Sequence, residues 1–131
     1  MSCGRISETV EGNLFIRRFP LVRGEAPLES HSHNFDHVSY CALGRVLAVK
    51  MRPEVDANGV IERRDDGLPR LIEIDRREME PGDHMLIRSH EWHTFSLLDG
   101  CDVARVDGIF SHRDPDGTVT RDYRGYAGAY R

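Results

Sequence analysis

The sequence is poor in cysteine and in long apolar stretches. Its three cysteines, Cys3, Cys41 and Cys101, are odd in number and form no CxxC pair, so a disulfide framework is not expected. No apolar run approaches the roughly 20 residues that span a bilayer, and the N-terminus lacks the apolar core of a signal peptide. These absences predict a cytoplasmic protein that does not interact with membranes.

The chain also lacks a strong excess of charge of one sign. Eighteen Lys and Arg residues stand against 22 Asp and Glu residues, for a net charge of −4, so no positive field is present to recruit nucleic acid. The 131 residues, 39% hydrophobic and 31% charged, suit one globular domain rather than a disordered chain. We therefore predict a single domain over residues 1–131.

Short apolar or alternating segments recur along the chain and are separated by turn residues such as Pro81-Gly82-Asp83 and Asp99-Gly100. No segment keeps a helical repeat over three turns, and many short strands at regular spacing predict a sandwich or barrel. We expect an all-β fold with a core at about residues 13–111. The predicted strands are Asn13–Phe19, Asp36–Leu43, Arg45–Met51, Val60–Arg63, Leu71–Ile74, His84–Arg88, Thr94–Leu98 and Val103–Phe110.

Three further expectations concern the parts around this core. The turn Asp56–Gly59 predicts a hairpin inserted between the two halves of the barrel. The polar tail of residues 112–131 is expected to wrap the surface, with some helix near Tyr126–Tyr130. A sheet of this kind has edge strands, so we predict a homodimer in which Asn13–Phe19 covers an edge of the neighbouring copy.

Six of the seven histidines fall into two clusters, within residues 30–37 and 84–93. Residues i and i+2 of a strand project from one face, about 6.5–7 Å apart, so His31 and His33 can aim at one point. A chain turn near residues 34–35 would bring His37 to the same place. A lone histidine is more often a surface or hydrogen-bonded residue, and this is the expectation for His84, His90 and His112.

Two stretches resemble the paired motifs of the cupin family. The sequence HSHNFDH at residues 31–37, followed by Gly44, is similar to the first motif. The sequence PGDHMLIRSHEWHTF at residues 81–95 is similar to the second, with His93 at the ligand position and Phe95 as the aromatic residue that follows it. The resemblance implies a double-stranded β-helix, or jelly-roll barrel, and a divalent metal bound by His31, His33, His37 and His93.

The sequence departs from the family pattern at two positions. Arg88 stands where the family usually has proline, a change that leaves the fold in place. His37 stands where the family usually has a glutamate ligand, which makes the site all-histidine and leaves the 2+ charge uncompensated. Such a site favours anionic ligands and disfavours Mg and Ca. Asp36 is an alternative ligand only through a bulge, because regular alternation points it away from the face of His37.

Alternation also predicts the walls of the pocket. If His37 and His93 face inward, then Ser39, Cys41 and Leu43 do so on the first strand, and Phe95 and Leu97 on the second. For Arg105 the parity does not decide between the pocket and an outer-face salt bridge. The candidates for contact with a substrate are Tyr40, Arg88, Trp92, Phe95 and Arg105.

Cupins with histidine-only sites include thiol dioxygenases and dioxygenases that cleave β-diketones. The resemblance therefore favours an Fe(II) dioxygenase acting on a small anionic or chelating substrate, with Mn, Ni, Zn and Cu as alternative metals. A metal-containing module that binds or senses a small ligand without catalysis is the second hypothesis. A metal-dependent isomerase or lyase ranks lower, since no inward Glu or Lys is evident as its base.

Overall fold

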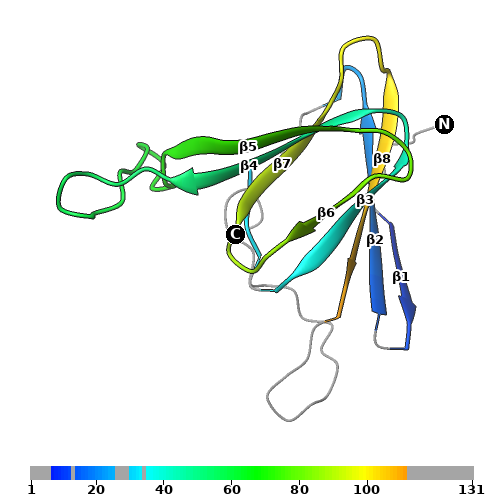
Figure 1. Ribbon diagram of the computed structural model, residues 1–131, viewed down its shortest axis with the longest axis horizontal. Coiled ribbons are helices and arrows are strands. Elements are labelled where there is room, and N and C mark those ends of the chain that lie inside the picture. The colour runs from blue at the N-terminus through cyan, green and yellow to red at the C-terminus, as the bar shows by residue number, and fades with distance from the viewer. Residues whose placement is uncertain (1–6, 13, 26–29, 34, 112–131) are drawn as a thin grey trace.

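The structure is a computed structural model that describes residues 7–12, 14–25, 30–33 and 35–111. Within these residues the chain forms two antiparallel sheets and no helix, as the sequence predicts. The strands are β1 (Ser7–Glu11), β2 (Leu14–Val22), β3 (His37–Leu43), β4 (Val46–Pro53), β5 (Leu71–Met79), β6 (His84–Ile87), β7 (Trp92–Leu97) and β8 (Val103–Phe110). Figure 1 shows the two sheets facing each other, with the long connection between β4 and β5 extending away from them.

The larger sheet has the strand order β1-β2-β8-β3-β6, and the smaller has the order β5-β4-β7. Successive strands β3 and β4 lie in different sheets, as do β7 and β8, so the chain crosses between the layers. This topology places the starts of β3 and β7, each of which carries a histidine, near one another on facing sheets.

Two predicted elements differ from those observed. Residues Val60–Arg63 do not form a strand but make isolated bridges, Val55 with Ile61 and Arg63 with Pro69, in the connection between β4 and β5. The turn predicted at 56–59 is present, since the Asp56 carboxylate accepts bonds from two backbone N–H groups of that loop. Apolar and polar residues do alternate in this segment, and this pattern predicts a strand. In the projecting connection the segment covers no core, and it makes only isolated bridges.

The first strand of the structure, β1, was not predicted. It pairs with β2 over its whole length, while β8 pairs with the other side of β2. The expectation that the segment around residues 14–19 covers an edge of another copy was therefore wrong, because both sides of β2 are occupied within one chain. The prediction of a homodimer itself stays a prediction. The tail expected to wrap the surface, including residues 126–130, lies outside the described residues.

Alternating side chains fill the space between the sheets. His37, Ser39 and Cys41 of β3 are buried, as the sequence predicts, whereas Leu43 is 52% exposed. The prediction that Leu43 faces inward was wrong because the pairing of β3 with β8 shifts register between Cys41 and Leu43. At such an irregularity the two-residue period no longer holds.

The chain then turns at Gly44, which has a φ of 71°. A Cβ at this position would overlap the carbonyl oxygen of Val103 and lie 2.8 Å from the Cα of Ala104. Only glycine combines this left-handed backbone with so close an approach of two strands. Gly44 thereby sets the tight connection from β3 to β4.

Two groups of buried apolar residues make the core. The larger, which includes Cys41, Val46, Met79 and Ile87, lies between the sheets. The smaller contains Phe15, Phe35 and Phe110 and lies at the end of the barrel that carries the histidines. Within the described residues, no helix is long and apolar enough to cross a membrane.

Candidate metal centre

The segment before β3 is attached to the start of β7 by backbone hydrogen bonds. The N–H of His31 donates to the carbonyl of His93 at 3.1 Å, and the N–H of His93 donates to the carbonyl of His31 at 2.9 Å. This pair forms an isolated antiparallel bridge. Two histidines that are 62 residues apart in the sequence thus become direct cross-strand neighbours, whose side chains share one face.

The turn between β6 and β7 holds the other end of the same segment. The N–H of His90 donates to the carbonyl of His33 at 2.7 Å, and the N–H of Ser89 donates to the Asp36 carboxylate at 2.7 Å. His90 has a φ of 67°, a strained conformation for a residue other than glycine. The turn therefore fixes the backbone that positions His33, and Asp36 serves this contact rather than the inside of the barrel.

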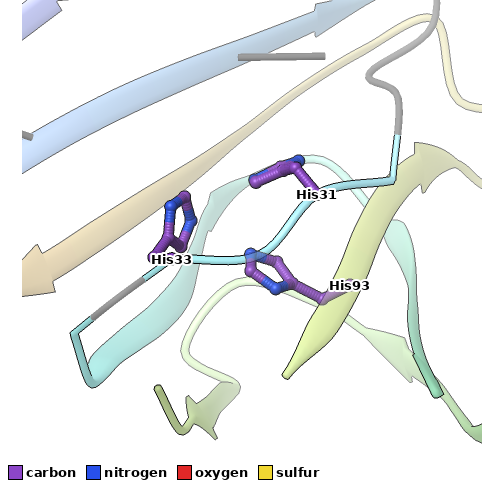
Figure 2. A group of neighbouring side chains, drawn as sticks. All are labelled: His31, His33 and His93. Atoms are coloured by element: carbon purple, nitrogen blue, oxygen red, sulfur yellow. The ribbon is translucent and has the colours of Figure 1, made fainter. Parts of the chain in front are cut away.

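Four imidazoles converge between these elements. The nearest ring nitrogens of His31, His33 and His93 all lie within 4.8 Å of one another, and Figure 2 shows the three rings close together, two from the segment before β3 and one from β7. The ring of His37 lies 4.9 Å from that of His33 and 5.1 Å from that of His93, measured between centroids. The structure thus brings together the four histidines of the sequence prediction, with His37 adjoining the tightest group of three.

All four side chains are buried, and burial lowers the pKa of three of them. Desolvation lowers the pKa of His37 from 6.5 to about 4 and holds the pKa of His33 and of His93 well below 6.5. The neighbouring imidazoles act in the same direction, since adjacent positive charges repel. The rings of His33, His37 and His93 are therefore neutral at physiological pH, the state in which a histidine nitrogen has a lone pair for a metal.

Two details of hydrogen bonding fit these rings to a metal. Nδ1 of His93 lies 2.9 Å from the carbonyl oxygen of Glu91. A carbonyl only accepts, so Nδ1 carries the proton and Nε2 keeps the lone pair, the arrangement that commonly orients metal-binding histidines. Nδ1 of His37 is buried and has no hydrogen-bond partner among the described residues, which is costly unless a ligand outside the chain satisfies it.

A cavity of about 30 Å³ adjoins the four imidazoles. Its walls are mainly apolar, with contributions from Phe19, Leu21, Phe95, Val106 and Phe110. Apolar walls exclude water, and exclusion of water strengthens any electrostatic interaction at the histidines. The space suits a small ligand beside the cluster.

The structure brings only one of the five predicted substrate contacts, Phe95, to this cavity. Trp92 is buried at the start of β7 but does not line it. Tyr40 and Arg88 are exposed. Arg105 makes two hydrogen bonds to Asp107, at 2.9 and 3.1 Å, away from the cavity, so of the two orientations considered for Arg105 the salt bridge is the one observed.

Several residues that line the cavity were not predicted from the sequence, and one of them is charged. Arg17 of β2 lines the cavity together with the histidines. The available signal was the position of Arg17 in the alternating pattern of β2. Phe15, Arg17 and Phe19 share one face of the strand, and both aromatic residues face inward. Alternation groups Arg17 with these two aromatic residues, but only the pairing of β2 with its neighbours shows that this face lines the cavity.

Comparison with models of protein families and with curated proteins finds no match for the sequence. Solved structures do match. An RmlC-like cupin with a double-stranded β-helix from Methanocaldococcus jannaschii has a TM-score of 0.55 at 11% identity, covering 82% of this chain and 78% of that chain. KdgF from Halomonas sp. has a TM-score of 0.53 at 19% identity, covering 85% and 80%.

A third similar structure is the hydroxypropylphosphonic acid epoxidase of S. wedmorenis in complex with fosfomycin. Its TM-score is 0.53 at 12% identity, over 79% of this chain and 49% of that one. At identities this low the likeness concerns the fold. The chain has the double-stranded β-helix fold of cupin proteins, with a group of three buried histidines that could hold a metal.

Proposed function

We propose that the chain binds one divalent transition metal through His31, His33 and His93, with His37 as the fourth ligand. The observation that carries the proposal is the convergence of buried imidazoles on one point beside an apolar cavity. A structural role alone accounts poorly for this arrangement, because Nδ1 of His37 is buried without a hydrogen-bond partner among the described residues, and such burial is costly.

The donor set selects the class of metal. Imidazole suits Fe, Zn, Cu and Ni, whereas Mg and Ca prefer oxygen ligands. Four neutral ligands leave the metal its full 2+ charge, which favours an anionic ligand in the remaining positions. We propose Fe(II) as the metal in the cell.

We further propose that the protein is a dioxygenase for a small anionic or chelating substrate. When bound, the metal would supply Lewis acidity and one-electron chemistry with O₂. The chain's own contribution is to orient the ligands, through the bond from His93 to Glu91, and to surround the substrate with apolar side chains such as Phe19 and Phe110. The epoxidase of similar fold is named for a phosphonic acid, an anionic compound, in keeping with this substrate class.

The experiment is O₂ uptake by protein reconstituted anaerobically with Fe(II), against a panel of small carboxylic acids, thiols and β-diketones. One comparison sample is protein loaded with Zn(II), because this ion cannot change its oxidation state. The other two are the variant His93→Ala and the control variant His84→Ala, which removes an exposed histidine of β6. We expect substrate-dependent uptake in the wild type and in His84→Ala only. A protein that holds one Fe(II) and consumes no O₂ across the panel would contradict catalysis and favour a binding module.

A further inference from the structure

Arg17 lies in a transverse row of residues that crosses the larger sheet. In register, Glu8 of β1 is opposite Arg17 of β2, Arg17 is opposite Gly108 of β8, and Gly108 is opposite Ser39 of β3. Arg17, Gly108 and Ser39 all line the cavity. Adjacent strands are about 4.8 Å apart, so Arg17 and Ser39 are separated by about two strand spacings across the cavity floor.

Gly108 keeps the floor between them open. A Cβ at this position would lie 3.8 Å from Cδ2 of His37 and 3.8 Å from the carbonyl oxygen of Arg17. With no side chain at Gly108, this part of the cavity lining beside His37 is backbone alone.

Arg17 is held in place by an ion pair. Its Nε donates to Oε2 of Glu8 at 3.2 Å, and only 18% of its side chain is exposed. A guanidinium carries a permanent charge and presents several donors in a planar fork. Among the described residues that line the cavity, Arg17 is the one with a permanent positive charge.

We propose that Arg17 determines specificity by binding the carboxylate of a small organic acid, whose other end faces the histidine cluster. The fork of a guanidinium matches a carboxylate bidentately. The mainly apolar walls of the cavity match a short aliphatic body. This role of Arg17 rests on the proposed function in one respect only: the metal would be the group that meets the other end of the acid.

The experiment measures binding of propanoate, with propanamide as its neutral analogue of the same shape, by chemical-shift titration in two-dimensional NMR. Each titration is run on metal-free protein and on Zn(II)-loaded protein. The variants are Arg17→Met and Arg17→Lys. The matched control is Arg18→Met, since Arg18 is the next residue of β2, points to the opposite face and bonds to Thr9 at 2.6 Å.

We expect the wild type to bind propanoate at least tenfold more tightly than propanamide. Arg17→Met should lose at least tenfold in propanoate affinity and Arg17→Lys a smaller factor, because the ammonium keeps the charge without the fork. Arg18→Met should remain within twofold of the wild type. Propanoate binding that is equal in the wild type and both Arg17 variants would overturn the proposal, and if Arg17→Met does not fold, Arg17→Lys alone decides.

The two forms of the protein separate this proposal from the metal. If Zn(II) does not bind at all, the proposed function fails, while loss of propanoate affinity in the metal-free Arg17 variants still supports the anion site. If Zn(II) binds with the expected stoichiometry and the Arg17 variants retain propanoate affinity, the metal site stands and the assignment of Arg17 is wrong.

Discussion

Removal of metal should make the stability of the fold depend steeply on pH, and His37 lets the size of the effect be calculated. The pKa of His37 is lowered from 6.5 to about 4 by burial. Between these two values the unfolded chain binds a proton that the folded chain excludes, so the free energy of unfolding falls as pH decreases. Each pH unit contributes about 1.4 kcal/mol, and the loss for this one residue is therefore about 3 kcal/mol by pH 4.

The perturbation is His37→Gln, measured by urea unfolding at 25 °C in excess chelator from pH 7.5 to pH 4. The contribution of neutral His37 to the free energy of unfolding is fully present above pH 6.5 and is lost as pH falls toward 4. Over this range the free energy of unfolding of the variant should therefore fall by about 3 kcal/mol less than that of the wild type. His33 and His93, whose pKa values are also lowered, should keep part of the dependence in the variant. His84→Gln should leave the wild-type curve in place. Parallel curves for the wild type and His37→Gln would refute the reasoning.

Three other perturbations test the fold and the charge of the site. Gly44→Ala should destabilise the protein by several kcal/mol more than Gly59→Ala, measured by urea unfolding, because both have positive φ but only Gly44 meets neighbouring backbone. Phe15→Ala should cost about 3–5 kcal/mol and lower the melting temperature, unlike Leu14→Ala, since Phe15 is fully buried and Leu14 is 48% exposed. His37→Glu should retain metal and weaken azide binding at least tenfold in Co(II)-loaded protein, because about 4 kcal/mol of Coulomb energy is at stake for a unit charge at 4 Å; equal dissociation constants in a spectroscopic titration would show that position 37 does not ligate.

The fold was predictable because strand patterning and turn residues are local signals. Alternation identified the strand from His37, and the PGD turn before β6 is present, with the N–H of Asp83 donating to the carbonyl of Glu80 at 2.9 Å. Alternation failed at Leu43, where a register shift interrupts the period. It also failed in the connection around Ile61, where the residues alternate but make only isolated bridges and belong to neither sheet.

The histidine cluster was predictable because its members have a recognisable spacing in the sequence. The position of Arg17 beside the cavity was not predicted. Arg17 reaches the cavity only because β1 and β8 flank β2 and fix which face is inside. Pairing of strands distant in sequence is not encoded in any short window. Arg105, which a sequence reading finds equally attractive, has the opposite phase on its strand and bonds to Asp107 instead.

The most direct test of the account is the metal content of the protein. Protein purified without a metal-affinity column is stripped with chelator, equilibrated with Co(II) or Zn(II), freed of excess ions and analysed by elemental mass spectrometry. The account predicts one ion per chain in the wild type and in His84→Ala, and loss of most of the metal in His93→Ala. A wild type that retains no ion, or a His93→Ala variant that retains the wild-type amount, would contradict it.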